Sequence, residues 1–356
     1  AAPGHIEVGL LAPDQLDTAL SIASKTDKAA LAALHTHLTP QAAAPASAPP
    51  TTPDAIPPLA DLSPIQSLGG STGAKLYADA QGQQYVVKTG GTAGGDPAGH
   101  VQNEVTADRL YAALGIPTPA GALQSQHGTP VKVAAFVPDA VALKSLHGSA
   151  KTAAHAHLAQ GFAADALLGN WDVVGAEQDN VLVGSDGTVW RIDNGGALAY
   201  RAQGATKTAS EWGAVPLELW TLRQSSKNPQ TATVFGALTW GQITEQMRSL
   251  VQQQKTILAH AGAAQDVLSQ RLQTMATLVD ATDSLQVAGV DDLAIEVFLK
   301  QWAQAQAGGK AAPPPPVNPQ TWFQKQVDAL VAKGYSLEDA QAMAAALAQK
   351  LGFSVG

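Results

Sequence analysis

The chain of 356 residues contains no cysteine. Disulfides, thiolate metal sites and cysteine nucleophiles are therefore excluded, and the remaining metal ligands are carboxylates, amides and the nine histidines. Hard cations such as Mg²⁺ suit oxygen ligands best.

Long apolar runs and basic residues are also scarce. No apolar run reaches the roughly 18 residues that a membrane span requires, and the first residues, AAPGHIEVGLL, lack a basic leader followed by a hydrophobic block. We expect a soluble protein in the cytoplasm, or one delivered into a host cell or virion. The net charge of -8 argues against general binding to nucleic acid or anionic membrane, so any bound phosphate requires local cations.

Proline is concentrated in two clusters, at 40–64 and 313–319. Such Ala/Pro-rich stretches bury too little apolar surface to offset the entropy of ordering, which is typical of linkers. The sequence therefore predicts a helical hairpin at 1–39, a linker at 40–64, a central domain at 65–308, a second linker at 309–320 and a small helical bundle at 321–356.

A glycine-rich turn, LGGSTGAKLY, lies between two β-type segments near the start of the central domain. Gly69, Gly70 and Gly73 let backbone N–H groups approach phosphate oxygens closely, and Ser71 and Thr72 could add hydroxyl donors. A glycine-rich hairpin without a ligand would give the same pattern. The motif GxxxxGK[ST] is absent, which disfavours a P-loop NTPase.

Lys88 ends the apolar strand YVVK, where an ammonium group needs an anionic partner because an unpaired buried charge is costly. Glu104, early in the helix predicted over about 101–114, is the candidate partner. A strand lysine paired with a helix glutamate is the arrangement by which kinases hold nucleotide phosphates. The alternative is that both residues lie separately on the surface.

The most informative stretch runs from 169 to 196, GNWDVVGAEQDNVLVGSDGTVWRIDNGG. Two β-rich runs flank a turn at 184–187 and predict a hairpin. Asn180 precedes its first strand and Asp193 follows its second, so an amide oxygen and a carboxylate are expected side by side, as a Mg²⁺ site requires. Asp172 lies in the preceding loop. The alternative is that Asp172 and its neighbours are ordinary turn residues.

The order of these elements resembles the protein-kinase-like superfamily. The phrases NEVTADRLYAALGIPTP, GNWDVVGAEQDNVLV and WRIDNGGAL look closest to the atypical branch that includes actin-fragmin kinase, phosphatidylinositol 3-/4-kinases and HipA-type kinases. The resemblance implies that the turn from Gly69 to Gly73 covers the phosphates of ATP, that Lys88 contacts them and that Glu104 positions Lys88.

The same resemblance implies that Asp172 is the catalytic aspartate and that Asn180 and Asp193 bind Mg²⁺, Asp193 in the place of the metal-binding aspartate of a DFG motif. Asp172 and Asn180 are eight positions apart (180 − 172), whereas about five is usual in protein kinases. Either the loop carries an insertion or Glu177 takes part of the role.

We therefore expect an α+β, bilobal kinase-like fold, with a small antiparallel-sheet lobe at about 65–139, a larger helical lobe at about 140–308 and helical appendages. The expected reaction moves the γ-phosphoryl group of ATP to a hydroxyl on a protein, with Mg²⁺, and the C-terminal helices suit docking of a protein partner. Two alternatives remain open. One is a nucleotide-binding pseudokinase or assembly component of a multidomain phage or effector protein, which the wide spacing favours, and the other is an AMPylase. Arg201 and Lys207 either contact phosphate or substrate, or belong to a solvated basic loop.

Overall fold

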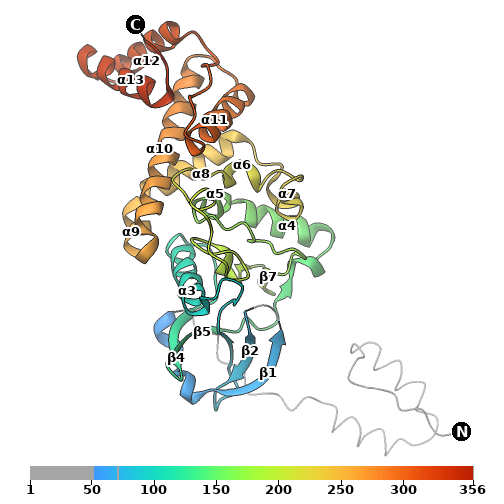
Figure 1. The fold of residues 1–356 in the computed structure, drawn as a ribbon. Helices are drawn as coiled ribbons and strands as arrows, with labels where there is room; N and C mark the ends of the chain where they lie inside the picture. Colours follow the sequence, from blue (N-terminus) through green and yellow to red (C-terminus); the bar gives the residue numbers. More distant parts are fainter. Residues whose placement is uncertain (1–51, 70–71, 356) are drawn as a thin grey trace, which may run out of the picture. The chain divides into compact units, whose positions relative to one another are not determined.

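The computed structural model describes residues 52–69 and 72–355. The helical hairpin predicted at 1–39 lies outside the described residues, as do Gly70 and Ser71 of the glycine-rich turn. The described chain is α+β, with a small antiparallel sheet followed by a larger, mainly helical part (Figure 1). This is the predicted fold class, and it is consistent with a bilobal kinase-like fold.

The small part is built on a five-stranded antiparallel sheet with the strand order β1-β2-β3-β5-β4. Its strands are β1 (Ser63–Gly69), β2 (Ala74–Ala78), β3 (Gln84–Lys88), β4 (Gly121–Gln126) and β5 (Thr129–Ala135). The register of β3 against β5 sets Lys88 opposite Lys132. Because strand side chains alternate between faces, both lysines lie on the face opposite Tyr85, Val87 and Val133, which are buried in a separate apolar cluster.

That apolar cluster is completed by the chain just before β1. Ile56, Leu59 and Leu62 are buried in it, and the side chain of Gln124 in β4 accepts a hydrogen bond from the Leu59 N–H at 2.6 Å. The last third of the stretch predicted as a linker at 40–64 is thus packed on the sheet from about Ile56. The domain boundaries themselves stay predictions.

Helix α3 (Pro97–Ala113) contacts β5 and β4 (Figure 1). Its acidic side chains bind Lys132 on the lysine face of the sheet. Asp96 caps its first turn by accepting a hydrogen bond from the Gly99 N–H, and Pro97 occupies the first helical position, where no donor is lost. Glu104 and Asp108 are four residues apart and so share one face of the helix, and both are buried.

The predicted hairpin is formed by β7 (Val181–Val183) and β8 (Val189–Arg191), which join β6 (Val141–Ala142) in a three-stranded sheet. The turn at 184–187 is closed by a hydrogen bond from the Gly184 N–H to the Thr188 carbonyl at 2.9 Å. The Ile192 N–H donates to the Asn180 carbonyl at 2.9 Å, so the pairing continues up to the residues that flank the hairpin.

The larger part is helical and shares one apolar core. Its helices are α4 (Gly148–Ala159), α5 (Phe162–Leu167), α6 (Glu218–Thr221), α7 (Pro229–Phe235), α8 (Trp240–Gln252), α9 (Gln254–His260), α10 (Gln265–Val287), α11 (Asp292–Ala307), α12 (Pro319–Ala332) and α13 (Leu337–Leu351). Trp322 of α12 and Phe353 after α13 belong to this core, and Trp322 donates to Ser284 of α10 at 3.2 Å. None of the helices in the described part of the chain is long and apolar enough to span a membrane.

Candidate functional site

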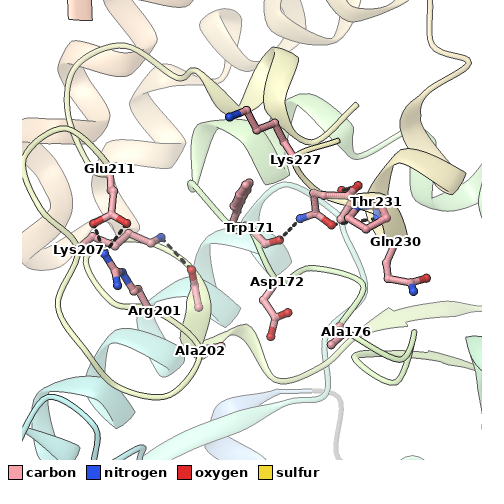
Figure 2. A pocket seen from close by; sticks show the side chains of 14 residues that line it. Trp171, Asp172, Ala176, Arg201, Ala202, Lys207, Glu211, Lys227, Gln230 and Thr231 are labelled. Atoms are coloured by element: carbon pink, nitrogen blue, oxygen red, sulfur yellow. Dashed lines mark hydrogen bonds and ion pairs between the residues drawn. The ribbon is translucent and has the colours of Figure 1, made fainter. Parts of the chain in front are cut away.

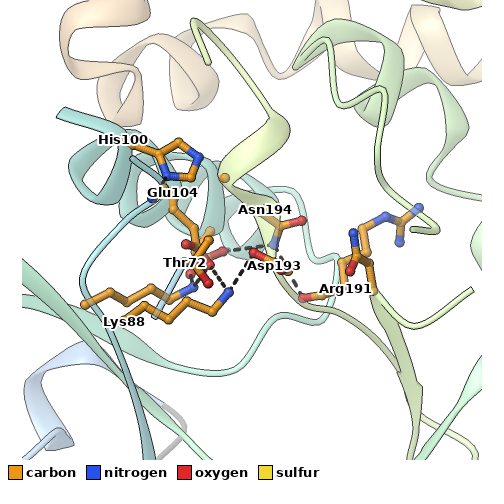
Figure 3. Close-up of polar contacts among 12 residues, drawn as sticks. Thr72, Lys88, His100, Glu104, Arg191, Asp193 and Asn194 are labelled. Atoms are coloured by element: carbon orange, nitrogen blue, oxygen red, sulfur yellow. Dashed lines mark hydrogen bonds and ion pairs between the residues drawn. The ribbon is translucent and has the colours of Figure 1, made fainter. Parts of the chain in front are cut away.

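Lys88 lies at the centre of the polar site that the sheet, α3 and the hairpin form together. Its Nζ atom is 2.7 Å from Glu104 Oε1 and 2.8 Å from Asp193 Oδ1 (Figure 3). The side chain of Lys88 is 11% exposed and that of Glu104 is fully buried. Two carboxylates from separate elements therefore hold one ammonium group on the sheet. The expected pairing of Lys88 with Glu104 is present, whereas its role towards a nucleotide stays a prediction.

The charges of this cluster stabilise one another. Burial alone would lower the pKa of Lys88, but Asp193 and Glu104 outweigh it and raise that pKa above its ordinary value. Burial alone would raise the pKa of Glu104, but Lys132 and Lys88 hold it below its ordinary value. Because both groups stay charged over the whole neutral range, the cluster presents a permanently charged lysine.

Asn180 and Asp193 flank the hairpin as expected, and Asn180 also connects to Asp172. Asn180 Nδ2 donates to the Asp172 carbonyl at 2.8 Å and to Asp172 Oδ2 at 3.1 Å. The eight positions between these two residues are thus bridged by the amide itself. Among the described residues, no side chain donates to Asn180 Oδ1, which leaves this oxygen available as a ligand.

A cavity of about 390 Å³ contains most of the predicted nucleotide and metal residues. The polar side chains of its lining are Thr72, Lys88, Lys132, Asp179, Asn180 and Asp193. The remaining lining residues are Leu68, Gly69, Ala74, Val86, Pro119, Ala134, Ala135, Phe136, Val137, Leu182 and Ile192. The volume is within the usual range for small-molecule sites, of roughly 300–1,000 Å³. Gly73 is in the turn before β2 with a positive φ of 65° and is not among the lining residues.

The donor set of the site fits a Mg²⁺ ion. Asp193 has a side chain that is 38% exposed, and only one of its oxygens is bound to Lys88. Within the described residues no three His, Asp or Glu side chains gather as metal ligands. The groups that would hold the ion are the Asp193 carboxylate and the Asn180 amide oxygen, which no side chain in this part of the chain occupies. Few protein ligands suit Mg²⁺, which keeps waters and nucleotide phosphates in its shell.

Asp172 lines a second cavity, of about 550 Å³, whose lining does not include Asn180. In Figure 2 Asp172 lies centrally, with Arg201 and Glu211 to its left and Gln230 to its right. Burial raises the pKa of Asp172 to about 6, because the hydrogen bond from Asn180 offsets only part of the cost of desolvation and the negative charge of Asp193 adds to it.

Lys207 has a structural place in the wall of this second cavity. Its Nζ atom donates to the carbonyls of Gly169, Gly196 and Leu198 at 2.7, 2.8 and 2.9 Å, which uses all three ammonium protons. Burial lowers the pKa of Lys207 to about 7, although three carbonyl acceptors favour the charged form. Of the alternatives considered for Lys207, a freely solvated loop residue is therefore wrong.

Lys132 and Asp108 are further members of the buried cluster, beyond the residues predicted from the sequence. Lys132 interrupts the apolar run VKVAAFV in the same way that Lys88 ends YVVK, and it binds Glu104 at 2.8 Å and Asp108 at 2.5 Å. Asp108 follows Glu104 by one helical turn. Two sequence patterns predict this cluster: a lysine within an apolar strand, and two acidic residues on one face of a helix.

Comparisons with known proteins assign no role to these residues. No protein-family model and no curated protein matches the sequence. One similar solved structure is the crystal structure of CtkA, a proinflammatory kinase of Helicobacter pylori, with 13% sequence identity and a TM-score of 0.39. The match covers 60% of this chain and 90% of that chain. At this identity and TM-score the likeness carries no conclusion about activity, substrate or the roles of individual residues.

Proposed function

We propose that this chain is a kinase-like phosphotransferase that uses ATP and Mg²⁺ and moves the γ-phosphoryl group to a hydroxyl on a protein. The observation that supports this most is the meeting of Lys88 and Asp193, 2.8 Å apart, at one small-molecule-sized cavity. Catalysis of phosphoryl transfer consists mainly of positioning the phosphates and stabilising their charge. A fixed, permanently charged lysine beside a partly exposed carboxylate can do both.

The lining of the 390 Å³ cavity suits the two ends of a nucleotide. The apolar side chains Val86, Phe136 and Ile192 offer a surface for a base, and Lys88 offers its ammonium group to phosphate oxygens. A phosphate oxygen would take over part of the ion pair that Asp193 makes with Lys88. An Asp193 oxygen would then be free to bind the metal. Mg²⁺, when bound by Asp193 and Asn180, would neutralise charge on the phosphates.

Asp172 is suited to the role of proton acceptor. In the proposed step the acceptor oxygen bonds to the γ-phosphorus, the bond from the γ-phosphorus to the bridging oxygen breaks, and ADP leaves. The hydroxyl proton passes to the Asp172 carboxylate. With a pKa of about 6, this group is ionised at neutral pH and is a stronger base than an ordinary aspartate.

The acceptor would enter from the 550 Å³ cavity, because Asp172 lines that cavity and not the other. Its rim carries Arg201, Lys227 and Gln230, which suit a polar, hydroxyl-bearing segment. Asn180 lines the 390 Å³ cavity and binds Asp172, which lines the 550 Å³ cavity. The donor nucleotide and the acceptor would thus occupy two cavities that this hydrogen bond connects.

A nucleotide-binding pseudokinase is the second candidate, supported by the eight-residue spacing from Asp172 to Asn180. ATP labelled separately at its α- and γ-phosphorus separates the possibilities. We expect the protein to transfer γ-label to an added protein mixture or to itself. Transfer of α-label would instead indicate an AMPylase, and nucleotide binding with neither label transferred would indicate a pseudokinase.

Variants connect the label to the site. Asp193→Ala and Lys88→Met should each abolish γ-transfer, because they remove the metal ligand and the phosphate-binding cation. Asp186→Asn is the matched control: Asp186 is in the exposed hairpin turn and its side chain binds Thr188 locally. Full γ-transfer by Asp193→Ala would exclude the proposed metal site.

A further inference from the structure

Lys132 and Asp108 extend the Lys88 cluster into a ring of side-chain contacts, which is closed by the peptide bond between Asp193 and Asn194. Both lysines bind the same oxygen, Glu104 Oε1, at 2.7 Å from Lys88 and 2.8 Å from Lys132. Lys132 also binds Asp108 Oδ2, and its side chain is only 6% exposed. The remaining Asp108 oxygen, Oδ1, accepts a hydrogen bond from Asn194 Nδ2 at 2.9 Å.

Asn194 connects Asp108 back to Lys88, because Asn194 follows Asp193 in the chain and the Asp193 carboxylate binds Lys88 (Figure 3). The Asn194 side chain is held from three directions. Besides Asp108, its Nδ2 atom donates to the Arg191 carbonyl at 3.4 Å, and its Oδ1 atom accepts from Asn170 Nδ2 at 3.2 Å. Asn194 is 1% exposed, so it is fixed more firmly than its neighbour Asp193.

Asp193 itself needs such support. Its backbone is left-handed, with φ 55° and ψ 50°, a conformation that residues other than glycine rarely adopt. A conformation of this kind persists only where the surroundings determine it. The ring holds it on both sides: Lys88 binds the Asp193 carboxylate, and Asp108 binds the next side chain.

We propose that Lys132 and Asp108 are positioning residues that fix the Asp193 loop in its metal-binding conformation, an inference that rests on the proposed function. Lys132 holds Asp108 in place for Asn194 while it supports Glu104 for Lys88. Through Glu104, Lys132 therefore supports Lys88, which would bind the nucleotide. Through Asp108 and Asn194, it supports the loop that carries Asp193. Neither residue needs to touch a ligand for this role.

The charges of the ring explain why Lys132 is essential to it. Burial raises the pKa of Asp108 even though Lys132 opposes this effect, so removing Lys132 would raise that pKa further and weaken the charged form of Asp108. Glu104 would keep one cation instead of two. We expect Lys132→Met to leave the Lys88–Glu104 pair in place and to loosen the Asp193 loop.

The first test needs no ligand. Hydrogen exchange of the peptide that covers 190–198 should be faster in Lys132→Met than in the unaltered protein, since exchange reports local opening. The double variant Lys132→Met/Asp108→Asn removes one charge of each sign. It therefore leaves no unpaired charge at Asp108 that could unfold the protein. Lys75→Met, an exposed lysine on β2, is the matched control. Unchanged exchange at 190–198 in both Lys132 variants would overturn the proposal.

The second test measures ATP binding with and without Mg²⁺. Asp108→Ala is the variant for this test, because Asp108 binds Asn194 and does not line the 390 Å³ cavity. It should reduce the gain in affinity that Mg²⁺ provides by about ten-fold or more, as for other residues that orient metal ligands, and its metal-free affinity should stay close to that of the unaltered protein. An equal loss with and without Mg²⁺ would mean that Asp108 supports nucleotide binding in general and not the metal loop, against the proposal. If the unaltered protein binds no ATP at all, the proposed function fails. Hydrogen exchange at 190–198 would still show whether Lys132 and Asp108 hold the Asp193 loop.

Discussion

Replacing Asp172 by asparagine should stabilise the folded protein at neutral pH. The carboxyl is half-buried, and its pKa is raised from the ordinary 3.8 to about 6, first by burial and then by the nearby Asp193 charge. The unfolded chain therefore releases this proton at lower pH than the folded protein does. Asparagine carries no charge to desolvate, and its carbonyl oxygen can accept the same hydrogen bond from Asn180, now 3.1 Å long.

The magnitude and its pH window follow from this difference in pKa. A rise from 3.8 to about 6 corresponds to a penalty of about 3 kcal/mol as an upper bound. Screening at a half-buried site reduces it, so we expect a gain of about 1–2 kcal/mol in Asp172→Asn. Below the unfolded pKa both states keep the proton and the gain is absent. It grows as the pH rises towards 6 and is complete above that value.

The assay is urea unfolding of both proteins, without Mg²⁺, at about pH 4 and about pH 7.5. Asp186→Asn serves as a control with the opposite sign, because hydrogen bonds from Thr188 lower the pKa of Asp186. That control should lose stability at neutral pH. A lower stability of Asp172→Asn at about pH 7.5, or the same gain at both pH values, would refute the reasoning.

Three further predictions concern activity and buried polar contacts. The rate of γ-transfer should rise through about pH 6 as Asp172 ionises, and a pH–rate profile without this rise would contradict its role as base. Lys207→Met should lower the free energy of unfolding in urea by about 2–4 kcal/mol because three carbonyls lose their donor, whereas the exposed control Lys227→Met should change it by less than about 0.5 kcal/mol. Asp165→Ala should lower the free energy of unfolding by about 3–5 kcal/mol in the same assay, because Arg191 stays buried and loses its partner, 2.8 Å away. A decrease of less than about 1 kcal/mol would contradict this and show that water binds Arg191 in place of Asp165.

Local patterns in the sequence were sufficient for the hairpin and for the pairing of Lys88 with Glu104. The hairpin was predictable because a polar, glycine-bounded turn at 184–187 separates two β-rich runs, and neighbouring strands pair over short distances. The pairing was predictable because a lysine in an apolar strand requires an anion. The α+β class followed from the order of such elements. The nucleotide, the metal and the acceptor stay predictions.

Tertiary structure decided what depends on contacts between distant segments. The register that sets Lys132 opposite Lys88 fixes which lysines share Glu104, and no local pattern specifies how two residues 44 positions apart (132 − 88) pair across a sheet. The same holds for Lys207, which appeared as a loop residue and binds three carbonyls from other segments. The sequence by itself supplied the charged groups and the elements that carry them. Folding decided which of these groups meet, because buried charges are stable only with partners that the packing brings to them.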